Sequence, residues 1–226
     1  MVRLAALPTR RCDVPGFVTR TTAGNRERLV LCAADLFHRR GFEAASLDEL
    51  LNCTGIARSN LYYHFPSKLA LGQAVIDHWL DVYERAIVAP ALEHAGEGEA
   101  AVIRALFRHA CTTQDPEQGR VGCPVSRLCT ELAEAAPRVK EEVRAYFVGL
   151  ELRLADAFAA DPSREEARDT STAEGTVHQR ARRRAALVVA ALEGALTAAG
   201  LHGDPRTLLE VGDTLAEVVA EDLQHA

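Results

Sequence analysis

The stretch GIARSNLYYHFPSK, residues 55–68, predicts one short helix between two breaks in the chain direction. Gly55 suits a left-handed turn before the helix, and Pro66 ends it because proline cannot continue a helix. Leu61 and Phe65 lie four residues apart and therefore share one apolar face. The other faces carry donors and aromatic rings, on Arg58, Ser59, Asn60, Tyr62, Tyr63 and His64. We predict that this helix, over 57–65, is anchored through one face and presents the others to solvent.

Two further helices are predicted before this stretch. An apolar stripe with helical spacing runs over 25–40, ends at Gly41 and consists of Leu29, Ala33, Leu36 and Phe37. Ser46 and Glu49, three residues apart, form a capping box that opens the second helix, and residues 53–55 are expected to form the turn after it. Two helices joined by a glycine-containing turn are a helix-turn-helix, whose second helix enters the major groove of DNA.

The side chains of the 57–65 helix suit contact with DNA. Arginine reads guanine, asparagine reads adenine, and tyrosine hydroxyls reach phosphates. Ser67 and Lys68 add a helix amino terminus and a positive charge, and both features favour a phosphate. On periodicity alone, an ordinary three-helix core explains the pattern equally well.

The rest of the chain also has helical periodicity. Ser67 is expected to cap a long helix over about 67–88, which Pro90 and the glycines at 96–98 interrupt. Further helices are predicted at about 98–114, 123–134, 137–160, 181–200 and 205–224. Neither strand-like alternation nor an internal repeat is found in the sequence, so the predicted fold is all-α.

Two polar stretches lack this periodicity. Residues 1–24 are expected to form a flexible arm, either a poorly ordered extension or misassigned start, or a basic arm that touches DNA phosphates. Residues 161–184 are expected to form a partly disordered loop. Its end carries a basic cluster, which we interpret as a solvated approach to the next helix rather than as a DNA-binding patch: Arg180, Arg182, Arg183 and Arg184.

The distribution of charge separates the two parts of the chain. The 226 residues are 48% apolar and 26% charged, which is ordinary for a soluble globular protein and enough to form a core without disulfides or metal. We find no uninterrupted apolar run of the roughly 18 residues that a membrane span needs. Residues 1–70 hold ten Lys or Arg against six Asp or Glu, whereas residues 71–226 hold sixteen against twenty-six. A basic amino-terminal part on an acidic body suggests that the first part meets an anion.

The sequence argues against a metal centre and against catalysis. The six cysteines form no CxxC pair, no His-x-x-x-His or Glu-x-x-His pair occurs, and no phosphate-binding loop or cofactor fingerprint is present. We therefore predict neither an enzyme nor a cofactor or metal. The start of the chain lacks the apolar core of a signal peptide, so we expect a cytoplasmic protein with reduced thiols.

The runs GFEAASLDEL (41–50) and GIARSNLYYHFPSK (55–68) resemble the DNA-binding head of the TetR/AcrR repressors. The resemblance covers about 25–80, and its frame of Gly, Leu-Tyr, Phe and Lys is complete. It implies a helix-turn-helix head at 25–85, a ligand-binding and dimerisation domain of about six helices at 86–226, and a homodimer on a palindromic operator. It also implies that a small molecule swings the linking helix and separates the two heads.

The resemblance assigns DNA contacts position by position. Tyr62, Tyr63, His64 and Lys68 match positions that touch DNA in the family, whereas residues 58–60 occupy variable, sequence-reading positions. The predicted DNA-binding set is Ser46, Arg58, Ser59, Asn60, Tyr62, Tyr63, His64 and Lys68. Ala57 departs from the family, which often has a capping serine there, and loss of a cap costs on the order of 1 kcal/mol.

The second domain offers weaker signals. The segment 122–133 resembles a Gly-Cys-containing helix of one group of TetR-like regulators. Eight residues are candidates for lining a ligand pocket, with ordinary core or surface as the alternative for each: Trp79, Tyr83, Phe107, Cys111, Cys123, Arg127, Tyr146 and Phe147. The effector, the operator and the choice between repression and activation are not encoded in any recognisable motif. A constitutive, ligand-independent DNA-binding protein is a further alternative.

Cys123 suggests a second kind of sensing. Pro124 suits the first position of a helix, so Cys123 would lie at its amino terminus, where the dipole lowers a thiol pKa. Arg127 would act in the same direction if its side chain reaches back. Cys129 is six residues away, too far for a disulfide with Cys123. A thiol- or electrophile-sensing regulator is therefore an alternative, against the simpler interpretation of Cys123 as a small buried hydrophobe.

The last two predicted helices are apolar beyond a single stripe. Residues 185–196 and 208–219 carry Ala, Leu and Val on more than one face. Such helices need cover on several sides, which an isologous four-helix interface between two subunits would supply. The alternative is that both faces are buried within one subunit.

Overall fold

The computed structural model describes residues 24–161 and 171–224, and these ranges contain helices but no β-strand. The all-α prediction is thereby confirmed for the described part of the chain. The predictions for the arm at 1–24 lie outside it except for Gly24. The first three helices are α1 (Asn25–Arg40), α2 (Leu47–Thr54) and α3 (Arg58–His64). Cys53 and Thr54, expected in a turn, complete α2, and Gly55 alone takes the left-handed conformation, with φ 66°.

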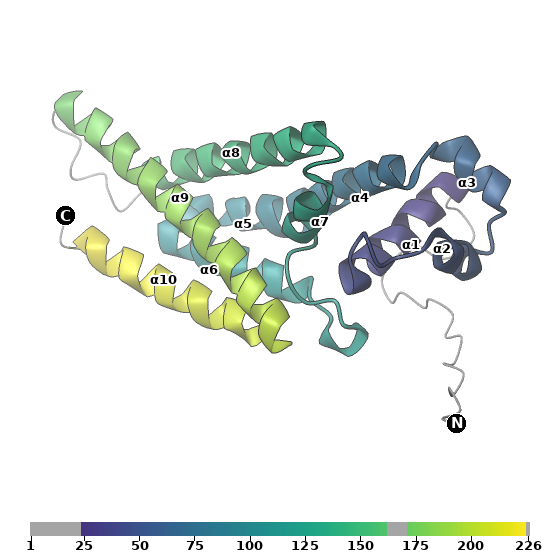
Figure 1. Ribbon diagram of the computed structural model, residues 1–226. Helices are drawn as coiled ribbons and strands as arrows, with labels where there is room; N and C mark the ends of the chain where they lie inside the picture. Colours follow the sequence, from purple (N-terminus) through teal and green to yellow (C-terminus); the bar gives the residue numbers. More distant parts are fainter. Residues whose placement is uncertain (1–23, 162–170, 225–226) are drawn as a thin grey trace.

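Helices α1–α3 share a small core at one end of the molecule (Figure 1). Leu29 from α1, Leu50 from α2 and Leu61 from α3 are each at most 1% exposed. Phe65 follows α3 and is buried with them. The apolar positions spaced four apart in the sequence thus fix how α3 is held, because their side chains are the ones that the other two helices cover.

The linking helix continues past the proline that was expected to end it. Helix α4 (Lys68–Tyr83) passes through a π-helical turn, Glu84–Val88, into α5 (Ala89–Leu92) and a 3₁₀ turn, Glu93–Glu97. The amide of Ala89 donates to the carbonyl of Glu84, five residues back. We attribute the continuity at Pro90 to this wider turn, which shifts the hydrogen-bond register just before the residue that cannot donate. The break comes only at Gly98, whose φ is 103°.

Five longer helices build the second domain. They are α6 (Glu99–Thr112), α7 (Pro124–Leu132), α8 (Pro137–Ala159), α9 (Ser171–His202) and α10 (Arg206–Gln224), with a 3₁₀ turn at Pro116–Gln118 before α7. Helix α10 packs on α6 and α9, and α9 packs on α8. The short α7 lies between this group and the head, beside α1 and α4 (Figure 1).

The start of α9 corrects the loop expected at 161–184. Residues 171–184 are helical, and only 162–170 lie outside the described residues. The basic cluster therefore sits on a helix at the end of the molecule opposite the head, where it cannot share a DNA surface with α3 (Figure 1). Arg184 pairs with Glu99 on α6, at 3.2 Å, and with Asp222 on α10. Arg184 is thus held by two neighbouring helices, whereas Arg180, Arg182 and Arg183 are exposed.

Helix α9 is also more apolar than the sequence suggested. Its residues Val177–His202 are long and apolar enough, by length and composition, to cross a membrane. The same segment carries one of the stripes that packs on α8 and α10, formed by Ala181, Ala185, Val188, Leu192 and Leu196. Core packing thus accounts for much of its apolar character.

Candidate nucleic-acid interface and the groove behind it

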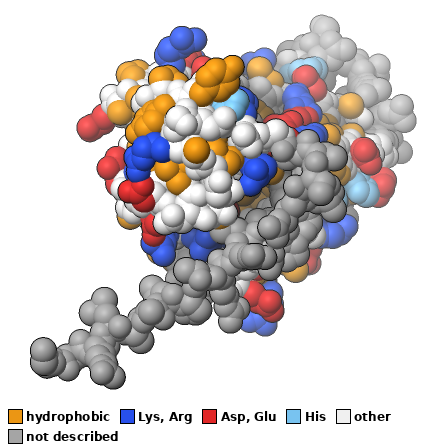
Figure 2. All heavy atoms as spheres, turned by 90° about the vertical axis from the view of Figure 1, so that its right-hand side faces the viewer, with side chains coloured by type: hydrophobic (Ala, Val, Ile, Leu, Met, Phe, Trp, Pro, Cys, Tyr) orange, Lys and Arg blue, Asp and Glu red, His pale blue; other side chains and the backbone are white. Residues whose placement is uncertain are grey.

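Helix α3 exposes Arg58, Ser59, Tyr62 and Tyr63 to solvent, whereas Asn60 and His64 are half-buried and the side-chain oxygen of Asn60 is enclosed. Leu61 and Phe65 are buried, whereas Tyr62 is 45% and Tyr63 is 82% exposed. The Tyr63 ring meets the His64 ring edge-on, with centroids 5.0 Å apart. Figure 2 shows this end of the molecule, where Lys and Arg side chains are interspersed with apolar ones. A large exposed tyrosine beside basic groups is suited to a phosphate-bearing surface.

The amino terminus of α3 has no side-chain cap, but its first residue forms an ion pair. Ala57 offers no side-chain hydrogen bond to the helix, as its sequence implied. Arg58 instead forms an ion pair with Asp48 of α2. Both side chains are more than half exposed, so the pair adds little stability and can be exchanged for a DNA contact.

Ser46 and Lys68 lie at the first turns of α2 and α4. The Ser46 hydroxyl accepts the amide of Glu49 at 3.1 Å, and the Glu49 carboxylate accepts the amide of Ser46 at 3.1 Å, which confirms the capping box. That backbone hydrogen bond also lowers the pKa of Glu49. Lys68 donates to the carbonyl of Glu43 at 3.3 Å and lies 4.6 Å from the centre of the Phe42 ring. Its ammonium group retains further donor capacity for a phosphate.

Two arginines of α1 also reach this end of the head, and sequence reasoning did not single them out. The Arg26 guanidinium lies 5.3 Å from the centre of the Phe65 ring, next to the end of α3. Arg28 donates to the carbonyl of Thr54 at 2.5 Å, at the end of α2. Their position on the first turn of α1, far from the motif in sequence, gave no local signal for this placement.

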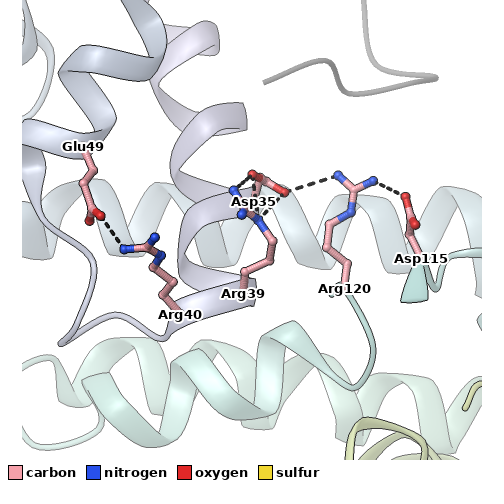
Figure 3. Close-up of polar contacts among 6 residues, drawn as sticks. All are labelled: Asp35, Arg39, Arg40, Glu49, Asp115 and Arg120. Carbon is pink, nitrogen blue, oxygen red and sulfur yellow. Dashed lines mark hydrogen bonds and ion pairs between the residues drawn. The ribbon is translucent and has the colours of Figure 1, made fainter. Parts of the chain in front are cut away.

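A chain of charges joins the head to the second domain (Figure 3). Asp35 of α1 pairs with Arg39 at 2.5 Å and with Arg120 at 3.3 Å, and Arg120 pairs with Asp115 at 2.6 Å. The side chains of Asp35 and Arg120 are only 10% and 14% exposed. Leaving a buried charge without its partner costs free energy. This series of ion pairs therefore holds α1 against the segment that precedes α7.

Helix α7 holds the other side of the same junction. Glu131 accepts the amides of Phe42 at 2.5 Å and Glu43 at 3.0 Å, and Arg127 donates to the carbonyl of His38 at 3.0 Å. Gly41 is required here, because its φ is 86° and an added Cβ would lie 2.8 Å from a Glu131 oxygen. Arg127 thus points to the head and to Glu131, not back to Cys123 as the sequence suggested.

His38 is enclosed at this junction. It is 7% exposed, and its ring meets the Trp79 ring edge-on at 5.6 Å. Burial first, and then the charges of Arg120 and Arg127, lower the pKa of His38 to about 4, against the raising influence of Asp35. The imidazole is therefore neutral at physiological pH, and protonation would place a positive charge among arginines.

A groove of about 380 Å³ opens between α7, α8 and α9, on the side of α7 away from the head. This volume lies in the range of small-molecule sites. The lining residues are Ser126, Cys129, Thr130, Val143, Phe147, Glu151, Ala186, Val189, Ala190 and Glu193. Helix α7 therefore contributes side chains both to the groove and to the head junction.

Glu193 connects the groove to a polar cluster beneath it. The Ser126 hydroxyl donates to one of its oxygens, and the other lies 3.4 Å from the Tyr83 hydroxyl and 3.5 Å from the Cys123 sulfur. Tyr83 also donates to the Cys123 sulfur at 3.2 Å. Burial, with Cys123 and Glu193 nearby, raises the pKa of Tyr83 well above its ordinary value. The neighbours of the Glu193 carboxylate in this cluster are thus neutral groups, and no ion pair joins it among the described residues.

The structure brings part of the predicted pocket set together, because Tyr83 contacts Cys123 and Phe147, and Phe147 contacts Tyr146. Phe147 lines the groove, and Tyr83 and Cys123 lie under it, whereas Trp79 and Tyr83 border a second, water-sized cavity beside His38. Phe107, Cys111 and Arg127 have other surroundings. Phe107 packs against Gly212 of α10, Cys111 donates to the carbonyl of Pro205, and Arg127 faces the head. Sequence reasoning missed the two glutamates of the groove, because isolated acidic residues on long helices carry no pattern.

The thiols correct a further prediction. Cys123 does cap α7, its sulfur accepting the amide of Ser126 at 3.3 Å, but burial and then the Glu193 carboxylate raise its pKa to about 12. The expected lowering by the helix dipole is outweighed by loss of water. Cys32, Cys111, Cys123 and Cys129 are free thiols.

Within the described parts of the chain, no group of three or more His, Cys, Asp or Glu side chains is arranged to hold a metal ion. The site that the geometry does build is a polar, partly basic helix surface at one end. Behind it lies a groove, and α7 touches both the groove and the head.

Comparison with known proteins matches both parts of the chain. Residues 30–75 match the family described as bacterial regulatory proteins, tetR family. Residues 99–214 match the C-terminal domain described as transcriptional regulator LmrA/YxaF-like. The HTH-type transcriptional repressor BepR of Brucella suis is 30% identical over 144 residues, which make up 59% of this chain and 67% of BepR.

Solved structures share the fold. The TetR-family regulator SCO4454 of Streptomyces coelicolor superposes with a TM-score of 0.68 at 21% identity, covering 88% of this chain and 89% of that one. A cysteine-substituted CifR, a TetR-family regulator solved with a 26-base-pair operator DNA, has a TM-score of 0.67 at 21% identity and covers 88% of this chain and 98% of its own.

Proposed function

Because the chain belongs to the TetR family of bacterial transcriptional regulators, we propose that it is a repressor released from a palindromic operator by a small molecule. Members of this family bind DNA and are not enzymes. In this proposal residues 25–85 form the DNA-binding head and residues 86–226 the effector-binding and dimerisation domain. The observation that carries the proposal is the exposed polar face of α3 above a buried Leu61 and Phe65.

The proposed operator contacts divide into two kinds. Tyr62, Tyr63, His64 and Lys68 would position the head on phosphates, which carry no sequence information. Arg58, Ser59 and Asn60 would face base edges, where arginine and asparagine discriminate. Ser46, at the start of α2, lies exposed and would meet the backbone of the adjoining strand.

The exposed apolar residues of α9 and α10 support a homodimer. Leu187 and Leu201 of α9 are 52% and 81% exposed, and Val218 of α10 is 55% exposed. A two-fold contact between these helices would cover them and bring two heads to two half-sites. Leu187→Glu with Val218→Glu should yield monomers in sedimentation equilibrium. Val148→Glu, which adds the same charge at an exposed apolar residue of α8, should leave the dimer intact.

We propose that the effector occupies the groove and acts on the head through α7. Ser126 and Thr130 of α7 line the groove, while Arg127 and Glu131 bind the backbone of residues 38–43. A ligand that moves α7 would therefore also move α1 and the linking helix, because the three are in contact. A ligand without a difference in affinity for the two arrangements would change nothing.

The experiment that tests the repressor proposal uses the DNA flanking the coding region. Purified protein should shift a fragment that contains an inverted repeat, and the affinity should fall as salt rises, since phosphate contacts release counterions. The triple variant Arg58→Ala, Asn60→Ala, Tyr63→Ala should lose the operator. Unchanged tight binding by that variant would refute the assignment of α3.

Two alternatives are separated by the same assay. A constitutive DNA-binding protein would hold its operator with every metabolite tested, whereas the proposed repressor releases it with one. A thiol sensor based on Cys123 is disfavoured by the burial of that thiol and by its raised pKa.

A soluble regulator that binds operator DNA would work in the cytoplasm, and we propose that location.

A further inference from the structure

The groove carries negative charge that the described parts of the chain do not neutralise. Glu193 and Glu151 both line it. Within residues 24–161 and 171–224, neither carboxylate forms an ion pair, and the groups within hydrogen-bond distance of Glu193 are the neutral Tyr83, Cys123 and Ser126. Lys140 is near enough to influence the Cys129 thiol, yet it pairs with neither glutamate. The second part of the chain adds to this field, since residues 71–226 carry ten more acidic than basic side chains.

The rest of the lining is apolar and aromatic. Val143, Val189, Ala186 and Ala190 form the walls, and Phe147 adds a ring. That ring is held by edge-on contacts to Tyr83 at 6.5 Å and Tyr146 at 5.6 Å. A fixed aromatic ring beside carboxylates attracts a cation, and apolar walls take up the body attached to it.

We propose that this groove binds an amphiphilic organic cation, a quaternary ammonium, phosphonium or amine with an aromatic or branched apolar body. The inference rests on the proposed function in taking the groove as the effector site, and it adds the chemical class of the effector. Glu193 and Glu151 supply the countercharge, and Phe147 with the four aliphatic side chains contacts the body. An anion would bring like charge beside both carboxylates, so this arrangement disfavours it.

The test compares two probes of the same shape and opposite charge. Tetraphenylphosphonium and tetraphenylborate are titrated into the full chain by calorimetry, without DNA. The cation should bind, and Glu151→Gln or Glu193→Gln should weaken it about fivefold or more. Glu117→Gln removes the same charge from an exposed position outside the groove and should leave the affinity unchanged. The affinity for tetraphenylborate should not fall in either groove variant.

The outcomes separate this inference from the proposed function. Equal affinity of the cation for all four proteins, or preference for the borate, would overturn the assignment of ligand class. Glu151 forms no hydrogen bond or ion pair elsewhere among the described residues, so a folded Glu151→Gln variant keeps the test decisive even if Glu193→Gln disturbs the cluster. Operator release is measured separately. Cation binding that never releases the operator would uphold the groove chemistry and contradict the effector-released repressor.

Discussion

Helices α3 and α7 are both short, with seven and nine residues, but their polar side chains do opposite things. On α3 the tyrosines point to solvent, and only Arg58 is paired, with a neighbour on the surface. On α7 Arg127 and Glu131 bind the head, and Ser126 binds Glu193. An unengaged polar face is free for an external partner, whereas an engaged one couples parts of the same molecule. We therefore expect substitutions on α3 to change DNA binding and those on α7 to change communication.

The largest effect should come from the anchor of α3. Leu61→Ala removes a side chain that is 1% exposed and should lower the free energy of unfolding of the head by about 2–5 kcal/mol. Tyr63→Ala, on the same helix but 82% exposed, should change it by less than about 0.5 kcal/mol while weakening operator binding. Chemical denaturation and fluorescence anisotropy measure the two quantities. Similar destabilisation by both variants would contradict the division of α3 into an anchor and a contact face.

A pH effect of nearly that size should arise at the junction held by α7. The pKa of His38 falls from the ordinary 6.5 to about 4 in the folded protein, so the folded state binds the proton less readily than the unfolded state. The stability from this group is complete above pH 6.5 and is lost as pH drops toward 4, by up to roughly 3 kcal/mol. His38→Gln should flatten this part of the stability profile. His64→Gln, at the end of α3 and away from the junction, is the control for the substitution itself.

The next effect concerns the grip of α7 on the head. Glu131→Ala leaves the amides of Phe42 and Glu43 without their acceptor, at a cost of about 1–3 kcal/mol in unfolding free energy. Effector binding should persist, but release of the operator should need more effector. Glu134→Ala, which removes an exposed glutamate just beyond α7, serves as the matched control. If Glu131→Ala and Glu134→Ala responded alike to effector, α7 would not be the connecting element.

The head could be predicted from the sequence because its determinants are local. Ser46 with Glu49, Gly55, and the pair Leu61 and Phe65 each act within four residues, and the structure bears out the capping box, the glycine and the buried pair. Pro90 misled for a related reason: the π-helical turn that lets the helix continue depends on backbone geometry that residue identity does not encode. The loop expected at 161–184 was wrong for residues 171–184, because contacts with other helices hold this segment: Ala181 is buried and Arg184 pairs with Glu99.

The junction and the groove could not be predicted, because their residues meet only in three dimensions. Asp35 and Arg120 are separated by 85 positions, and Tyr83 and Glu193 by 110. No spacing rule links such pairs. The pocket candidates are large or reactive side chains of the second domain, and Phe107 and Cys111 belong to that set. In the structure α10 packs on Phe107, and Cys111 donates to the carbonyl of Pro205, just before α10. Burial by a partner helix is a property of the fold, and only the structure supplies it.

The smallest effect on DNA binding should come from the thiols of α7. They allow a buried and a half-exposed side chain to be compared within one helix. Cys123 is buried with a pKa of about 12, whereas Cys129 is partly exposed and lines the groove. A limiting thiol reagent should therefore modify Cys129 about tenfold or more faster than Cys123, since reaction requires an accessible thiolate. Mass spectrometry of the native protein gives the order, and Cys123→Ser should leave operator affinity nearly unchanged. Early modification of Cys123 would show that α7 opens readily toward solvent, and it would restore the thiol-sensing alternative that its burial argues against.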